Sequence, residues 1–204
     1  GIEAPPVTIE VFLSGGLPRF SVVGMPETAV RESSDRVRGA IINSGLPFPR
    51  ERITVSLAPA DMRKTGGRFD LAIALGILCA QKTFPARALD NAEFLGELSL
   101  NGDLRPVPGV LPAALRAGES GNAVFVPRDN AAEAALARCV VYPAGTLLDV
   151  IAHLRGVQLI EPTPDARPEP AESEGPDLDE VRGQSQARRA LEIAAAGGHN
   201  LLFI

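Results

Sequence analysis

The chain begins with an alternation of apolar and polar residues that is typical of a strand with one buried face. Residues 7–13 are apolar at every second position, and a second apolar run covers 20–23 after Gly15-Gly16. A period of two places the apolar side chains on one face of a sheet. The pattern predicts two strands joined by a turn.

A helical period follows these strands. Pro26 suits the first turn of a helix, where its missing amide hydrogen costs nothing. Val30, Val37 and Ile41 then recur on one side of the segment until Gly45. The sequence therefore predicts a helix with one buried stripe.

Strands and helices alternate from there to about residue 160. The β-branched segment 52–57 predicts a strand, and segment 71–80, which is apolar on all sides, predicts a central helix covered by other elements. Asn101-Gly102 lies between alternating residues of 93–107, a strong hairpin signal. Further elements are expected at 111–117, 123–126, 130–137, 140–142 and 146–154. This order predicts an α/β fold.

The last stretch, 177–204, has the pattern of one helix and one strand. Residues 184–196 are apolar at helical spacing, and Gly197-Gly198 is a helix-ending signal. The unbroken apolar run 201–204 is typical of a strand covered on both faces of a parallel sheet. Such a strand needs partners, so we expect this stretch to be the start of a domain that continues.

Charge is distributed unevenly along the 204 residues. Residues 1–160 hold 16 basic and 16 acidic residues, 161–180 hold 1 and 8, and 181–204 hold 3 and 1. The formal net charge of −5 is therefore caused by segment 161–180. Residues 1–160 are neutral overall and are able to present a basic patch, so the overall charge does not decide for or against nucleic acid.

Composition also predicts the organisation of the chain. Residues 161–176 contain five prolines and no large apolar side chain, which predicts an acidic, extended linker between one domain at 1–160 and another that begins at 177. The chain contains no apolar run of about 18 residues, so the sequence predicts no membrane span. Cys79 and Cys139, in a chain without a signal-peptide pattern, indicate free thiols and a cytoplasmic protein.

The final stretch resembles the beginning of the AAA+ module of Mg-chelatase-like ATPases of the ComM/YifB family. Its AAAGGHNLLFI, and upstream VGMPETAVRES, RVRGAIINSGLPFP, ITVSLAPAD, KTGGRFDLAIALGIL and FLGELSLNGDLR, are similar to that family's signatures in their order and spacing. In the family a Gly-rich phosphate-binding loop comes directly after such a strand. The resemblance implies that this loop follows Ile204 and that these 204 residues alone do not hydrolyse ATP.

Residues 1–160 resemble the inactive Lon-protease-like domain of the same family, a mixed-sheet fold shared with the second domain of the small-subunit ribosomal protein five. Segments 58–78 and 94–115 are similar to the Lon segments that carry a nucleophilic serine and the lysine that activates it. The serine position falls on Arg68 and the lysine position on Leu111. Neither side chain can replace a hydroxyl or an amine, so no catalytic residue is expected.

A separate hypothesis concerns the basic residues of the Gly-rich turn in segment 58–78. Arg63, Lys64 and Arg68 lie near the expected N-terminus of the buried helix, where positive side chains beside free backbone donors suit an anion such as DNA phosphate. The alternative is that Arg68 forms an ion pair with Asp70 or Asp61 and fixes the turn.

For 177–204 the resemblance implies contacts with a nucleotide, because AAA+ proteins hold the adenine just before the first helix of the module. The residues concerned are Val181, Arg182, Gly183 and Gln184. ATP and Mg²⁺ are implied cofactors of the full-length protein, and none is expected for these 204 residues, because the contacts to the triphosphate lie elsewhere. A helix cap by Asp177 or Asp179 is the local alternative.

The resemblance implies that the full-length protein is a ring-forming, ATP-driven motor on single-stranded or branched DNA, a helicase in natural transformation and recombination. Residues 1–160 would then contribute to assembly of the homo-oligomer or to DNA contact. Three alternatives stay open: a metal-inserting Mg-chelatase subunit, a Ser-Lys peptidase and a pure interaction domain. The two histidines, His153 and His199, offer little material for a metal site.

Overall fold

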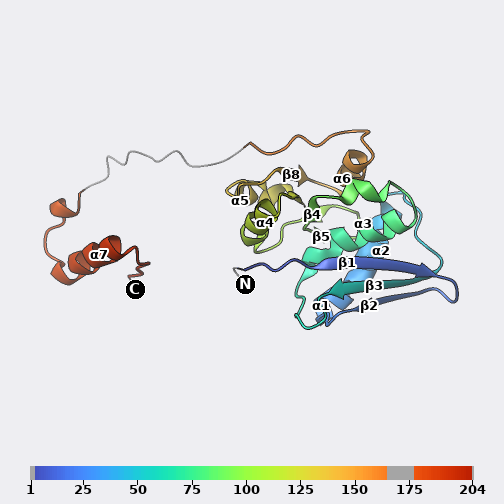
Figure 1. Cartoon of the computed structure of the whole chain (residues 1–204), viewed down its shortest axis with the longest axis horizontal. Coiled ribbons are helices and arrows are strands. Elements are labelled where there is room, and N and C mark those ends of the chain that lie inside the picture. The colour runs from blue at the N-terminus through green and yellow to red at the C-terminus, as the bar shows by residue number, and fades with distance from the viewer. Residues whose placement is uncertain (1–2, 165–176, 204) are drawn as a thin grey trace. The chain divides into compact units, whose positions relative to one another are not determined.

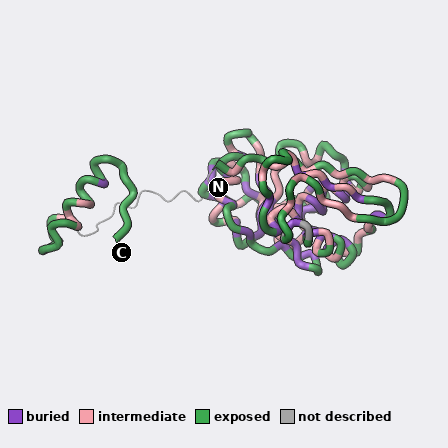
Figure 2. Tube along the Cα trace, turned by 90° about the horizontal axis from the view of Figure 1, so that it is seen from below, coloured by how far each residue is buried: buried purple, intermediate pink, exposed green. Residues whose placement is uncertain are grey.

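The computed structural model describes residues 3–164 and 177–203 (Figure 1). Its contacts divide the chain into two compact units, Gly1–Arg167, here the larger unit, and Pro168–Ile204, the smaller unit. Almost all buried residues belong to the larger unit, whereas Ala194 is the buried residue among those described in the smaller one (Figure 2). Each unit therefore has to be understood from its own contacts.

The first sheet of the larger unit has the strand order β1-β3-β2. β1 (Thr8–Ser14) runs antiparallel to β3 (Arg52–Ala58), and β2 (Arg19–Val23) runs parallel to β3. The strands predicted at 7–13 and 20–23 are confirmed, but they are not neighbours, because β3 lies between them. Parallel β2 and β3 need a crossover connection, and the helices that follow β2 supply it.

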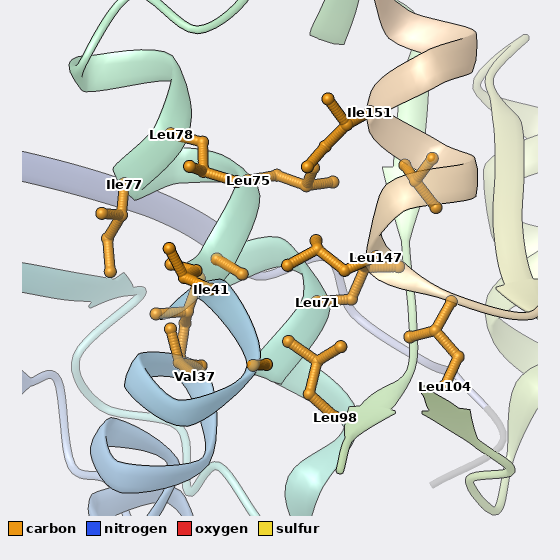
Figure 3. Close-up of a cluster of buried hydrophobic side chains, with 14 of the residues drawn as sticks. Val37, Ile41, Leu71, Leu75, Ile77, Leu78, Leu98, Leu104, Leu147 and Ile151 are labelled. Carbon is orange, nitrogen blue, oxygen red and sulfur yellow. The ribbon is translucent and has the colours of Figure 1, made fainter. Parts of the chain in front are cut away.

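Three helices cover one face of this sheet. α1 (Thr28–Arg31) and α2 (Ser33–Asn43) connect β2 to β3, and α3 (Asp70–Ala80) follows β3. α3 packs against both β1 and α2, and its apolar residues are buried on every side, as the sequence predicts. Figure 3 shows the core around it, with side chains from α2, α3 and α6 pointing toward one another: Val37, Ile41, Leu71, Leu75, Ile77, Leu78, Leu147 and Ile151.

A second sheet is parallel throughout, with the order β4-β7-β8. Its strands are β4 (Ala92–Phe94), β7 (Ala123–Pro127) and β8 (Val141–Ala144), and its helices are α4 (Val110–Glu119), α5 (Ala131–Ala134) and α6 (Leu147–Leu154). In β7, Phe125 belongs to the main core, while Val124 and Val126 belong to a second cluster with α4 and α5. β7 is thus covered on both faces, as its unbroken apolar sequence requires.

The predicted hairpin at Asn101-Gly102 is confirmed, although its strands are short. β5 (Glu97–Leu98) pairs antiparallel with β6 (Leu104–Arg105). Gly102 has a positive φ of 90° and donates its amide hydrogen to the Ser99 carbonyl (3.0 Å), which closes the loop. Short 3₁₀ turns complete the described elements, at Gly67–Phe69, Ala86–Leu89, Arg128–Asn130 and Leu178–Glu180.

The smaller unit contains helix α7 (Ser185–Gly197), which confirms the helix predicted at 184–196. Gly198 ends it in the left-handed conformation, and the His199 amide donates to the Ala194 carbonyl (2.8 Å). The strand predicted at 201–204 is not formed in the described part, 201–203, whose side chains are exposed. A strand needs a neighbouring strand to satisfy its backbone groups, and none pairs with it among the described residues.

Most of the predicted linker, 165–176, lies outside the described residues. Its first residues belong to the larger unit, because the Thr163 amide donates to the Val141 carbonyl of β8 (2.8 Å). Within residues 3–164 and 177–203, no helix combines the length and the apolar character needed to cross a bilayer.

Candidate functional site

The turn between β3 and α3, where the sequence places the former nucleophile, is held by the segment that leads into β5. The Gly96 amide donates to the Arg68 carbonyl, and the Leu71 amide donates to the Gly96 carbonyl, both at 3.1 Å. Gly67 is buried against Glu97, so that a Cβ added there would lie 2.3 Å from Oε2 of Glu97. A side chain at this position would therefore have to displace the side chain of Glu97.

A buried ion pair fixes the first residue of α3. Asp70 accepts hydrogen bonds from Nε (2.6 Å) and Nη2 (3.1 Å) of Arg36 on α2, and from the Leu98 amide (3.3 Å). The side chain of Asp70 is 1% exposed and that of Arg36 is 21% exposed. Burial raises the pKa of Asp70 to about 6, while the hydrogen bonds and charge of Arg36 act in the opposite direction. The pair locks α2, α3 and β5 together.

Arg68 is half-buried and reaches toward the loop that precedes α4. A methyl group placed on Gly109 would lie 3.6 Å from Nη1 of Arg68. Because Asp70 is occupied by Arg36, the alternative that Arg68 pairs with Asp70 is wrong, and in the described chain Arg68 makes no ion pair with Asp61 either. The Arg68 guanidinium therefore lies beside the start of α4 with its charge unneutralised by these two carboxylates.

Leu111, which the sequence comparison with Lon aligns with a lysine, lies in the first turn of α4. Its amide donates to Oε1 of Glu133 (3.1 Å), so a carboxylate of the same chain already occupies that helix end. Asn130 holds the preceding loop by donating to the Val107 carbonyl (3.0 Å) and accepting from the Val107 amide (2.9 Å). The fold thus brings the segment of Arg68 close to the loop that precedes Leu111.

The remaining residues of the anion hypothesis differ in exposure. Arg63 is exposed. Lys64 is 1% exposed, and its Nζ donates a hydrogen bond to the Pro59 carbonyl. This bond joins the two ends of segment 59–64 inside the protein. The prediction that Lys64 contacts an anion conflicts with this burial, because a side chain turned into the protein cannot reach a ligand at the surface. Arg63 and Arg68 are the two residues of the predicted group that stay available.

The predicted nucleotide contacts lie in an exposed loop before α7. Arg188 donates from Nη1 to the Val181 carbonyl (3.2 Å), and Gly183 and Gln184 both have positive φ, 76° and 48°. Gln184 occupies the N-cap position of α7. Asp177 accepts from the Asp179 amide (3.1 Å), so it caps the preceding 3₁₀ turn. All four residues of Val181–Gln184 are exposed, although the Val181 and Gln184 carbonyls already accept hydrogen bonds from Arg188.

Two family models match this chain. One described as subunit ChlI of Mg-chelatase matches residues 9–130, and one described as magnesium chelatase, subunit ChlI, matches 177–204. YifB of Escherichia coli strain K12 is 47% identical over 211 residues, and the competence protein ComM of Haemophilus influenzae is 48% identical over 209. The chain belongs to the ComM/YifB Mg-chelatase-like family.

Membership of the ComM/YifB family confirms the resemblance read from the sequence motifs. Both alignments take in the whole of this chain but 40% of YifB and 41% of ComM, so the chain spans about two-fifths of these relatives. Within the described residues, no group of three or more histidine, cysteine, aspartate or glutamate side chains is placed to hold a metal ion. The clustered charges of the larger unit are those of the β3–α3 turn and, separately, those of the first sheet.

Proposed function

We propose that this chain is the N-terminal part of an ATP-driven, ring-forming motor that moves branched DNA. The observation that carries the proposal is the pair of family-model matches, at 9–130 and 177–204, together with 48% identity to a competence protein along the whole chain. Natural transformation and recombination are the processes in which such a motor acts. The alternative of a metal-inserting chelatase is supported by the description of the family models. None of the described residues of the larger unit supports it further.

In this proposal residues 1–160 form a Lon-protease-like domain that has lost its chemistry and serves assembly or DNA contact. The positions of Arg68 and Leu111 support the loss of peptidase chemistry. Their segments lie close together, but neither side chain can attack a peptide. Arg63 and Arg68 are the residues of this turn that we propose to contact DNA phosphate, because both carry positive charge outside the buried pair. Residues 161–176 connect this domain to the motor module.

Residues 177–204 are proposed to begin the AAA+ module, with ATP and Mg²⁺ as cofactors of the full-length protein. The surface loop Val181–Gln184 fits the base of a nucleotide, because its residues are exposed immediately before α7. Residues 181–204 contain no lysine, so we propose that the lysine of a phosphate-binding loop is supplied by another part of the full-length protein. ATP, when bound, supplies the phosphoanhydride whose hydrolysis drives movement.

The proposal is tested with the full-length protein and a synthetic four-way DNA junction. We expect ATP hydrolysis to be faster with the junction than without DNA, and the junction to be resolved into duplexes when ATP is present. A non-hydrolysable ATP analogue is the control and should support assembly without movement of the strands. Mass photometry in the same solutions should detect a ring. A protein that binds and hydrolyses ATP, ignores every DNA tested and instead binds porphyrin would contradict the motor.

A further inference from the structure

The first sheet buries one face and leaves the other open. Ile53, Val55 and Leu57 of β3 are buried against α2 and α3. The alternate residues point away from the core and form three rows across the strands β1, β3 and β2, called the open face here. The rows are Ser14–Arg52–Arg19, Phe12–Thr54–Ser21 and Glu10–Ser56–Val23.

Two arginines stand side by side in the first row of the open face. Arg19 and Arg52 are register partners on adjacent parallel strands, which lie about 4.8 Å apart. Both are exposed, and neither forms an ion pair or a side-chain hydrogen bond within the described residues. Like charges at neighbouring strand positions repel one another. Within the described residues the fold supplies no carboxylate to this pair, so both guanidinium groups are available to an anionic ligand.

The loop between β1 and β2 forms a hollow beside these arginines. The hollow has a volume of about 490 Å³ and is lined by Gly15, Gly16, Leu17, Pro18, Arg19 and Arg52. The loop is exposed throughout and protrudes beyond the strands (Figures 1 and 2). Neither glycine has an atom within 4 Å of the place where a Cβ would stand, so no other part of the chain covers the loop at these two residues. Guanidinium groups beside an uncovered loop suit phosphate oxygens.

An aromatic side chain occupies the next row of the same face. Phe12 is 66% exposed, opposite Thr54 in the centre of the sheet. A large apolar side chain directed at water from the middle of a strand has no role in this core. Exposed aromatic rings on open sheets, flanked by arginines, are the means by which proteins stack the bases of single strands.

We infer that the open face binds single-stranded DNA, with Arg19 and Arg52 on backbone phosphates and Phe12 stacked on a base. The inference deepens the proposed function, since it names the strand that the larger unit contacts and the surface that does so. Charge complementarity selects the occupant: the two adjacent arginines outnumber the single carboxylate of the open face, Glu10, so the face suits a polyanion better than a second copy of itself. A free phosphate ion would use the arginine pair and leave Phe12 without a partner.

The ring contact is tested first, with a fluorescent reporter. The chain contains no tryptophan, so Phe12→Trp places a single indole on the open face. We expect the emission of this indole to be quenched on titration with an oligo(dT) of about 20 nucleotides, because stacked indole and base interact directly. Val157→Trp, at a position that is 78% exposed and outside the first sheet, should show no quenching. Equal responses of the two reporters would overturn the stacking contact.

The charged row is tested by the salt dependence of binding. Removal of both arginines in R19A/R52A should weaken oligo(dT) binding and make the plot of log K against log [salt] shallower by about 1.4, the value for two phosphate contacts on a single strand. The matched control R87A/R155A removes the same charge from exposed residues outside β1, β2 and β3, and should leave the slope unchanged. Equal slopes for the two double variants would overturn the inference.

A variant at Phe12 distinguishes binding of single-stranded DNA from binding of other polyanions. F12L keeps an apolar side chain but removes the ring, and should weaken oligo(dT) binding by at least about fivefold. Binding of heparin, which has no bases, should not change in F12L. If F12L leaves oligo(dT) binding intact, or if inorganic phosphate at millimolar concentration displaces the oligonucleotide at once, the open face binds phosphate alone and the inference fails.

These measurements use the 204-residue chain without ATP, so they are independent of the motor. A full-length protein that moves junctions equally well as wild type and as R19A/R52A would contradict the open face and leave the motor standing. Oligo(dT) binding that depends on Arg19, Arg52 and Phe12, in a protein that never moves a junction, would contradict the motor and leave the open face standing.

Discussion

Two groups of charged residues in the larger unit are built in opposite ways. At the β3–α3 turn, Asp70 is paired with Arg36 and Lys64 donates to a carbonyl, and both Asp70 and Lys64 are withdrawn from water. On the open face, Arg19 and Arg52 adjoin one another, exposed and without an acidic partner. A charge that the fold neutralises internally holds elements together, whereas a charge left unneutralised at the surface is available to a ligand.

The comparison reverses the expectation from the sequence motifs. The Gly-rich turn carries the three cations of the anion hypothesis, Arg63, Lys64 and Arg68, yet one of them, Lys64, is turned inward. The first sheet carries no such motif, yet it presents two cations, an exposed ring and an open loop together. The charges of the β3–α3 turn that are buried therefore have a structural role.

The largest effect is expected from Asp70→Ala. Removal of one partner of a buried ion pair leaves the other charge unpaired, so we expect the free energy of unfolding to fall by about 3–5 kcal/mol. Chemical denaturation of the 204-residue chain measures it. Glu119→Ala, in the exposed pair with Arg116 at 2.7 Å, is the matched control and should cost less than about 1 kcal/mol.

A double-mutant cycle shows whether the loss belongs to the pair. In R36M/D70A neither charge remains, so the double variant should be clearly more stable than the sum of the two single losses predicts. Strict additivity would mean that Asp70 acts through its hydrogen bond from the Leu98 amide instead, and the contrast between the two charge groups would lose its main support.

The pH dependence of stability gives the second test. Because burial raises the pKa of Asp70 to about 6, the folded state holds a proton between about pH 4 and pH 6 that the unfolded state has released. The part of the stability that comes from this bound proton is therefore complete below about pH 4 and is lost as the pH rises through 6, whereas the ion pair with Arg36 is formed above that pH. We expect the stability difference between wild type and D70N to shrink over this window by up to about 3 kcal/mol. A difference that grows with pH would mean that Arg36 outweighs burial.

Much of the larger unit could be predicted from apolar periodicity. The central helix, the hairpin and the alternating elements up to residue 154 follow from patterns that burial imposes on neighbouring residues. Sheet order could not be predicted, because β3 enters between β1 and β2 through contacts between residues about 40 positions apart. The partner of Asp70 was missed for the same reason: Arg36 lies 34 positions away on another helix.

A smaller loss of stability is expected from Lys64→Met. Methionine keeps the length of the side chain but leaves the Pro59 carbonyl without its donor, so the free energy of unfolding should fall by about 1 kcal/mol. Lys82, the other lysine of the chain, is exposed, and K82M should be neutral. DNA binding should be unchanged in K64M and weakened in R63A/R68A. Weaker DNA binding in K64M alone would restore Lys64 to the anion site.

One residue of the open face has a signal in the sequence. The alternation of Val7, Ile9, Val11 and Leu13 predicts the inner face of β1, and by the same rule it places Phe12 outside. An aromatic residue out of phase with its strand is therefore a candidate for binding. The adjacency of Arg19 and Arg52 had no such signal, because their register depends on how β2 and β3 pair.

The smallest change in the free energy of unfolding is expected from Arg52→Thr. The sign of this change is the test. Threonine suits a strand and removes the repulsion with Arg19, so the free energy of unfolding should rise by about 0.5 kcal/mol while binding of oligo(dT) weakens. Arg87→Thr, at an exposed 3₁₀ turn, should change neither property. If Arg52 lowers the stability of the fold and supports binding, its role is to bind the ligand. If R52T lowers stability by more than about 1 kcal/mol, Arg52 holds the fold together as Asp70 does, and the two groups of charges no longer differ in kind.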